Sequence, residues 1–225
     1  MKKLLGFSIF LVFVLIASLT AEAKVTLPAI FSDNMVLQQN TQVNVWGKAA
    51  PGEKVTVKAS WLDKPVTAKA AANGKWTVKL KTPKATTNQS VTVSGENEIT
   101  INNVLIGEVW LCTGQSNMEF PVSRHPDVKW NTGMLNEAEE LKDADYPEIR
   151  LFHVKHQLAH EGELDDCEGE WLVCNPKNLY DFSAVGFVFG RKLYKELKMP
   201  VGLIQSTWGG THAESWTKLD VMKKN

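Results

Sequence analysis

The sequence predicts an antiparallel β-sandwich followed by an α/β domain of three layers. Two observations support this class. From about Val25 to Asn103, apolar and polar residues alternate in short runs separated by turn residues. From Val104 onward, nearly continuous apolar runs alternate with a helical pattern, which is typical of a parallel sheet covered by helices. We therefore expect a β-sandwich over residues 24–105 and an α/β domain over residues 106–225.

The alternation in the first half is clearest around Trp76. Trp76, Val78 and Leu80 fall on one face of a strand, and polar residues fall on the other. Asn73-Gly74 directly before it is a hairpin signal. The same period of two appears at Val43 and Val45, Val55 and Val57, Val91 and Val93, and Ile99 and Ile101. A sugar-binding face around Trp46, Trp61 or Trp76 is the functional alternative, but a Trp in an alternating strand is more often a core residue, and we expect that here.

The second half begins with a strand that is apolar on both faces, from Val104 to Cys112. The turn after it places Ser116 at the carboxyl end of that strand, where open α/β sheets bind their ligands. The pattern also predicts a helix over Ala184–Leu197 that Ser183 caps, with Val185, Val188, Phe189 and Leu193 facing inward. Two further strands are expected over Glu148–Val154 and Val201–Gln205. A surface helix is expected over Met134–Ala144, and another helix over Ala213–Val221.

The N-terminus has the pattern of a secretory signal peptide. Lys2 and Lys3 precede an apolar run over Leu4–Leu19, and Ala21-Glu22-Ala23 follows. The run is shorter than the roughly 20 residues of a spanning helix, so the alternative of a retained membrane anchor is less favoured. We expect residues 1–23 to be removed and the protein to be periplasmic or secreted, with no stable membrane anchor.

Composition excludes some classes of function. Lys and Arg number 25 against 25 Asp and Glu, a balance that argues against a nucleic-acid partner. The cysteines are Cys112, Cys167 and Cys174. A bridge between Cys167 and Cys174 is open, Cys112 is expected to be a buried small hydrophobe, and no Cys-x-x-Cys indicates redox chemistry. No cofactor is expected.

Ser116 is the candidate nucleophile. A serine needs a base for its proton and fixed donors for the oxyanion that develops in the reaction. Ser116 would lie on a tight turn with free backbone N–H groups, and Gly209 and Gly210 would offer more at the end of a neighbouring strand. The Gly-Gln-Ser-Asn spacing by itself is a weak signal of a nucleophile and is more often a plain turn.

Several motifs in order resemble the sialate O-acetylesterase family of SGNH-type serine esterases. They are Gly114-Gln115-Ser116-Asn117-Met118, Ile204 to Thr211, Glu214-Ser215-Trp216, Phe182 to Gly186, and, near the start, Leu27-Pro28, Phe31 to Gln38, Val45-Trp46-Gly47 and Ala50 to Glu53. The resemblance spans essentially the whole chain after residue 23. It implies an SGNH-hydrolase-like α/β domain.

The resemblance also implies hydrolysis of acetyl esters on sugars, mostly sialic acids, with relatives that act on acetylated plant polysaccharides. Carried over by position, Ser116 would be the nucleophile and would donate its own N–H to the oxyanion, and Gly210, in preference to Gly209, would donate a second. For contacts to the sugar we name Gln115, Asn117, Trp208 and Arg124 as candidates.

The sequence departs from the family in two places. The family's Gln-Gly-Glu segment, with a third oxyanion donor, and its Asp-x-x-His, with the base, are not found. The chain therefore resembles the front part of such an esterase, and we expect it to be weak or inactive alone. A truncated glycan-binding or interaction module and an acetyl xylan esterase-like enzyme are the alternative functions.

The histidines offer two further interpretations. His212 lies beside the glycine pair, but as a base it matches no catalytic position of the family. His153-x-x-His156-x-x-x-His160, followed by acidic residues, fits a metal site, but His153 ends an expected strand and an acidic run is usually a solvated loop. We expect neither role, nor one for His125.

Overall fold

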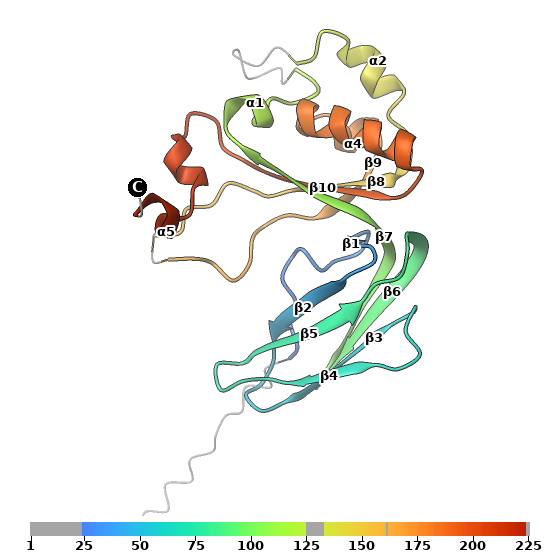
Figure 1. Cartoon of the computed structure of the whole chain (residues 1–225), viewed down its shortest axis with the longest axis vertical. Coiled ribbons are helices and arrows are strands. Elements are labelled where there is room, and N and C mark those ends of the chain that lie inside the picture. Colours follow the sequence, from blue (N-terminus) through green and yellow to red (C-terminus); the bar gives the residue numbers. More distant parts are fainter. Residues whose placement is uncertain (1–23, 125–132, 161, 224–225) are drawn as a thin grey trace, which may run out of the picture.

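The computed structural model describes residues 24–124, 133–160 and 162–223, so the expected signal peptide and His125 lie outside the described residues (Figure 1). One sheet has eight strands in the order β4-β3-β6-β7-β10-β8-β9, with β1 beside β7, and a second sheet pairs β2 with β5. The strands are β1 (Val36–Gln38), β2 (Gln42–Lys48), β3 (Lys54–Ala59), β4 (Val66–Lys69), β5 (Lys75–Lys81), β6 (Thr86–Ser94), β7 (Glu98–Gly114), β8 (Tyr146–His153), β9 (Trp171–Cys174) and β10 (Val201–Thr207).

Strand β7 joins the two halves of the chain. Its first part pairs antiparallel with β6, and its last residues, from Glu108 to Gly114, pair parallel with β10. Figure 1 shows β7 running from the lower sheet into the upper layer. The boundary expected near residue 105 therefore falls inside one continuous strand. The large sheet contains strands of both halves, so it does not separate the first half from the second.

The first half has its own apolar core. The inward residues of β2 and β5, among them Val45, Trp76 and Leu80, pack with Val57 of β3 and Val93 of β6 in one buried cluster. The period of two read from the sequence is confirmed for these strands, because the predicted apolar faces are the buried ones.

Trp46 is an exception to the expected core. Its side chain is 39% exposed, whereas Trp76 is 2% exposed and Trp61 is half-buried. The interpretation of Trp46 as a core residue is wrong, because in β2 the inward positions are those of Val45 and Gly47 and Trp46 lies on the opposite face of the pleat.

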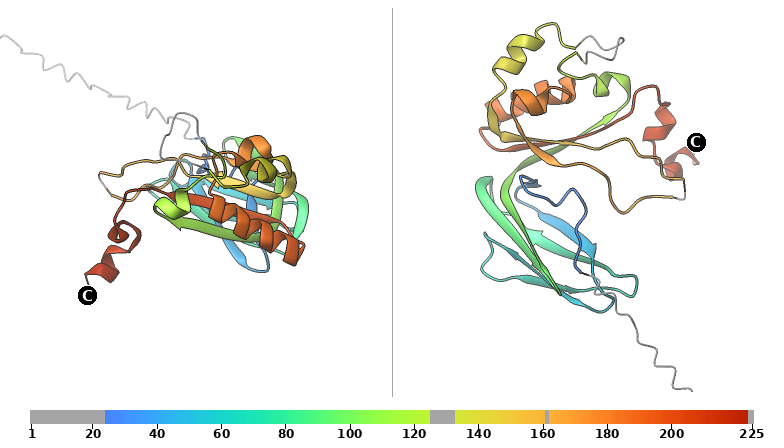
Figure 2. Two further views of the ribbon diagram at one scale, coloured as in Figure 1. Left: turned by 90° about the horizontal axis from the view of Figure 1, so that it is seen from above. Right: turned by 180° about the vertical axis from the view of Figure 1, so that it is seen from behind.

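The second half is mostly parallel, and only its edge strand β9 pairs antiparallel with β8. Strand β10 lies between β7 and β8 and is parallel to both, so the carboxyl ends of the three strands meet at one edge. The helices are α1 (Ser116–Glu119), α2 (Glu137–Lys142), α3 (Pro176–Leu179), α4 (Ala184–Leu197), the 3-10 helix η1 (Ala213–Trp216) and α5 (Leu219–Met222). In the rear view of Figure 2, α4 lies along the layer that contains β8 and β10. No helix within the described ranges is long and apolar enough to cross a membrane.

Helix α4 has the predicted bounds and the predicted cap, in which Ser183 Oγ accepts the Gly186 N–H at 3.0 Å. Of the four residues expected to face inward, Leu193 packs against the core, and the prediction is wrong for the other three. Val185, Val188 and Phe189 are each at least 40% exposed. The buried residues are Ala184, Gly186, Phe187 and Gly190. A methyl group at Gly190 would lie 2.5 Å from Leu203 Cδ1, so the glycines let the helix backbone approach the sheet, and apolar periodicity alone does not reveal this.

The other elements differ from expectation mainly in length. The helix expected over 134–144 is only α2, and the helix expected over 213–221 is replaced by η1 and α5. All three cysteines are free, so the Cys167–Cys174 bridge left open above is not formed in the structure. Cys112 is buried, as expected.

A buried arginine connects β8 to the start of β7. Arg150 is 4% exposed, and its Nη1 and Nη2 donate to the side-chain oxygens of Asn34 at 3.1 Å and Asn103 at 3.4 Å. Both asparagines have positive φ angles, of 69° and 53°, a conformation that Asn tolerates better than most residues. Burial lowers the pKa of Arg150, and its hydrogen bonds compensate for the lost hydration.

Candidate active site

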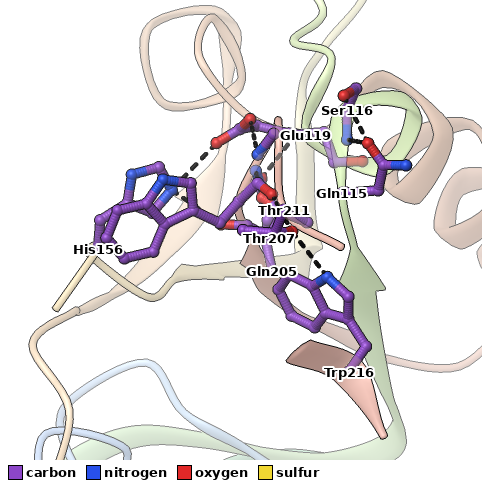
Figure 3. A network of polar contacts seen from close by, with 11 residues as sticks. Gln115, Ser116, Glu119, His156, Gln205, Thr207, Thr211 and Trp216 are labelled. Carbon is purple, nitrogen blue, oxygen red and sulfur yellow. Dashed lines mark hydrogen bonds and ion pairs between the residues drawn. The ribbon is translucent and has the colours of Figure 1, made fainter. Parts of the chain in front are cut away.

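The carboxyl ends of three parallel strands bring together residues that are far apart in the sequence. Strand β7 leads into Ser116 and Glu119 of α1, β10 leads into Gly209, and β8 leads into His156. Figure 3 shows Glu119 between His156 and the β10 segment, with Gln115 and Ser116 beside it. The expectation that Ser116 lies at this edge of the sheet is confirmed.

Ser116 is exposed, and its hydroxyl and its backbone N–H both bond the side chain of Gln115. Its Oγ donates to Gln115 Oε1 at 2.7 Å, and its backbone N–H donates to the same oxygen at 3.1 Å. The amide oxygen of Gln115 thus occupies the donor that would serve an oxyanion. A substrate oxygen that binds there displaces this contact and gains the same hydrogen bond.

Glu119 connects the Gly209 loop to His156. Its Oε2 accepts the Gly209 N–H at 2.5 Å, and its Oε1 lies 3.0 Å from His156 Nε2. His156 Nε2 also lies 2.8 Å from the carbonyl oxygen of Thr207. The side chain of Glu119 is only 20% exposed, so the carboxylate is held in a largely enclosed position by groups from two neighbouring strand ends.

Aromatic rings cover this network. The ring of His156 stacks on Trp208 with centroids 4.2 Å apart and planes inclined by 4°. Thr211 Oγ1 donates to the Trp208 carbonyl at 2.7 Å and accepts from Trp216 Nε1 at 2.9 Å. These two hydrogen bonds fold the segment from Trp208 to Trp216 back on itself and hold it in one conformation in the structure without a ligand.

Below the loop, the fully buried side chain of Gln205 makes two hydrogen bonds. Its Oε1 accepts the Ser183 N–H at 2.7 Å, and its Nε2 donates to Thr207 Oγ1 at 3.0 Å. These bonds join the end of β10 to the start of α4. The bond to Ser183 holds the end of β10 against the start of α4, and so helps to position the loop that carries Gly209.

The two glycines differ in position. A methyl group at Gly209 would lie 3.6 Å from Ser116 Oγ and would overlap the Glu119 carboxylate, whereas a methyl group at Gly210 would meet nothing within 4 Å. Gly210 has a φ of +77°, which requires glycine for backbone reasons. Gly209 therefore lies beside Ser116, and the oxyanion role that the sequence interpretation gave to Gly210 in preference to Gly209 stays a prediction.

The remaining candidate sugar contacts divide into two groups. Gln115, Ser116 and Asn117 line one open cavity of about 490 Å³, and Trp208 lines a neighbouring cleft of about 170 Å³. Arg124 lines neither; its backbone N–H donates to Glu137 Oε2 at 2.8 Å, at the start of α2. The structure brings Gln115, Asn117 and Trp208 to the Ser116 end of the sheet and does not place Arg124 in these walls.

The described histidines do not contact Ser116. His212 is exposed at the start of η1, and His156 bonds Glu119 and Thr207. His153 lines a cavity with His156 and Asp181, where burial lowers its pKa and Asp181 partly opposes this effect. Among residues 24–124, 133–160 and 162–223, no group of three or more His, Cys, Asp or Glu could hold a metal ion.

Two residues of the site were not found from the sequence. Glu119 follows Ser116 by one helical turn, and that proximity was the available signal. His156 has no local signal linking it to Ser116, because only the strand order β7-β10-β8 brings the segment after β8 to this edge.

No protein-family model matches the chain. It is 34% identical to the sialate O-acetylesterase of Mus musculus, with 87% of this chain and 38% of that protein aligned, and 33% identical to the Homo sapiens protein of the same name, with 83% and 37% aligned. The crystal structure of a carbohydrate acetylesterase from Xanthomonas citri superposes with a TM-score of 0.79 at 31% identity, over 89% of this chain and 44% of that one.

These matches agree in sequence and in fold, and they cover most of this chain. The chain spans little more than a third of the length of the curated relatives it matches. The serine motif on which the resemblance rested lies at the sheet edge that the structure identifies as the candidate site. The chain is therefore a homologue of sialate O-acetylesterases, similar to them over most of its own length.

Proposed function

We propose that this protein hydrolyses O-acetyl esters on sugars, with Ser116 as the nucleophile. One observation carries the proposal: Ser116 follows β7, and Gly209 lies beside its Oγ at the end of the neighbouring parallel strand β10. Acyl transfer requires backbone N–H donors next to a serine hydroxyl, and here those donors bond side-chain oxygens that a substrate oxygen can displace. The names of the relatives support acetyl groups on carbohydrates as the substrate class.

The reaction follows from these groups. Ser116 Oγ attacks the acetyl carbonyl carbon while a base takes its proton, and the carbonyl oxygen becomes an oxyanion. The N–H groups of Ser116 and of Gly209 or Gly210 bind that oxyanion. The bond to the sugar oxygen then breaks, the sugar leaves as an alcohol, and water hydrolyses the acetyl-enzyme to acetate and free Ser116.

We further propose sialic acids as the acetylated sugars, because the matched mammalian proteins carry that name. Acetylated xylan is the second candidate, because the structural neighbour is named only as a carbohydrate acetylesterase. Residues 24–105 as a β-sandwich domain, residues 106–225 as the first part of an SGNH-like domain, and export after removal of residues 1–23 belong to the same proposal. The shared core of β2, β3, β5 and β6 supports the first of these.

Chemical rescue tests the function directly. No described histidine hydrogen-bonds Ser116, so we expect slow acetate release that rises with added imidazole, which can accept the Ser116 proton from solution. Acetate is measured from 9-O-acetylated N-acetylneuraminic acid and from acetylated xylan. Ser116→Ala supplies the background, and Ser94→Ala on strand β6 is the matched control. Equal release by the native protein and Ser116→Ala at every imidazole concentration contradicts the proposal.

A further inference from the structure

A second cleft lies beside the β2–β5 pair. It has a volume of about 240 Å³ and is bordered by the segment from Thr26 to Pro28, by both strands, and by Asp165 and Asp166 from the segment before β9. None of its lining residues belongs to the cavity around Ser116. It is therefore a separate feature of the first half.

Trp46 forms the aromatic wall of this cleft. Its side chain lies on the outer face of β2 and is 39% exposed. The edge contact with Phe31, with centroids 4.6 Å apart and planes at 81°, fixes the orientation of the ring. A rigid, partly exposed indole offers an apolar surface at little entropic cost to a ligand.

Trp76 forms a buried part of the wall. It is 2% exposed, and no hydrogen-bond partner of its Nε1–H is found among the described residues. Gly47 lies next to this ring, and a methyl group at Gly47 would come within 2.9 Å of Trp76 Cζ2. Trp46 therefore offers the exposed indole of the cleft, and Trp76 belongs to the inward face of the β2–β5 pair, opposite Gly47.

The rim of the cleft is polar and has no net charge. Lys75 Nζ lies 2.6 Å from Asp165 Oδ1, and Lys48 Nζ lies 3.6 Å from Asp165 Oδ2. With Asp166, whose Oδ1 accepts the Ala29 N–H, the rim holds two cations and two carboxylates. The lysine and Asp165 side chains are about half exposed, so exchanging part of this network for ligand hydroxyls costs little.

Asp166 also links this cleft to the candidate active site. It lines the second, smaller cleft that contains Trp208, His156 and Trp216. The two clefts therefore share one wall, in the segment between β8 and β9. A ligand with several linked units that occupied both would extend from the Gly209 loop toward β2.

We propose that the Trp46 cleft is a carbohydrate-binding subsite that holds an uncharged pyranose ring. The C–H face of the sugar stacks on the Trp46 indole, and its hydroxyls bond Lys75 and Asp165. A sugar combines an apolar face with a rim of donors and acceptors, which is the pattern of this cleft, and the balanced charge disfavours an ionic ligand. The volume suits a single ring. The subsite acts without an ester and without Ser116, so it goes beyond the proposed hydrolysis.

Titration by NMR of the Ser116→Ala protein tests the proposal. The probes are xylotetraose and cellotetraose, which carry no acetyl group, and inorganic phosphate is the anionic comparison. We expect a sugar to shift the indole Nε1–H signal of Trp46 in a saturable manner. Trp46→Ala is expected to weaken binding about tenfold or more. Trp61→Ala is the matched control, because Trp61 belongs to the same half and does not line the cleft.

The outcomes are distinct. Loss of binding in Trp46→Ala, partial retention in Trp46→Phe and no change in Trp61→Ala support the subsite. No saturable shift of Trp46 with either sugar, equal weakening by Trp46→Ala and Trp61→Ala, or a response to phosphate alone overturns it. Trp46→Phe keeps the test valid if the alanine variant does not fold. Because the probes contain no ester, a failure of the proposed hydrolysis leaves these outcomes unaffected.

Discussion

The carboxylate of Glu119 accepts the backbone N–H of Gly209 at 2.5 Å, across 90 positions of the sequence. This bond occupies a donor that lies beside Ser116 Oγ and is suited to an oxyanion. The other oxygen of Glu119 lies 3.0 Å from His156 Nε2, so one side chain holds both the loop after β10 and the segment after β8. The position of Gly209 relative to Ser116 therefore depends on a residue that is neither nucleophile nor oxyanion donor.

We expect Glu119→Ala to release the Gly209 loop. The Gly209 amide proton should move upfield in an NMR spectrum, because a short hydrogen bond to a carboxylate deshields it. The free energy of unfolding should fall by about 1 to 3 kcal/mol, the range for a hydrogen bond to a charged group. Urea titration measures the second effect.

Glu139→Ala is the control for this change, because it also removes one carboxylate and Glu139 is exposed on α2, away from Gly209. It should leave the Gly209 signal in place. Glu119→Gln keeps an acceptor oxygen and should give an intermediate shift. An unchanged Gly209 signal in Glu119→Ala would show that the bond does not form in solution.

Gly190→Ala tests the buried face of α4. The added methyl group would lie 2.5 Å from Leu203 Cδ1, so helix and sheet must move apart. We expect a loss of about 1 to 3 kcal/mol in the free energy of unfolding, despite the better helix propensity of alanine. Val188→Ala on the exposed face should change stability by less than about 0.5 kcal/mol. A larger loss of stability in Val188→Ala than in Gly190→Ala would contradict this face and favour the one expected from apolar periodicity.

The pair formed by Glu140 and Arg191 should make stability depend on acid pH. Hydrogen bonds from Arg191 are the main cause that lowers the pKa of Glu140 below its ordinary value. A lowered carboxyl pKa adds stability above the ordinary value of 4.5, and this contribution is lost as the pH falls through the folded-state pKa. Glu140→Gln should therefore lose about 1 to 3 kcal/mol at pH 7 and much less near pH 3.

Chemical denaturation at a series of pH values measures this difference. Glu196→Gln is the control on α4, because Glu196 pairs with Lys192 in solvent and should show little effect at any pH. A gap between native protein and Glu140→Gln that stays constant from pH 7 to pH 3 would contradict the assignment.

The three free thiols make a prediction for thiol reagents. Burial raises the pKa of Cys174 to about 12, and it also raises the pKa of Cys112, so neither should react in the folded protein at pH 8. Partly exposed Cys167 should react slowly, because burial and Asp166 raise its pKa as well. All three should react in denaturant with a disulfide-exchange reagent such as Ellman's. Only one reactive thiol in denaturant would mean that Cys167 and Cys174 are bridged.

Much of the secondary structure was predictable because its signals are local. The alternation at Trp76, Val78 and Leu80 predicted a strand with one buried face, and β5 has that burial pattern. Ser183 predicted the start of α4, since a cap needs only its own helix. The inward face of α4 was predicted correctly only at Leu193, because Gly186 and Gly190 carry no apolar side chain to mark that face and exposed apolar residues flank the buried Phe187.

The sequence by itself determined the strand that leads into Ser116, the turn after it and, through its motifs, the resemblance to sialate O-acetylesterases. Each depends on residues that are neighbours in the chain. Only the tertiary structure decided that Gly209 lies beside Ser116, that Glu119 contacts both Gly209 and His156, and that Trp46 faces a cleft. These relationships arise from the order of strands β7, β10 and β8 and from the face on which each strand is buried, and contacts between distant segments set both.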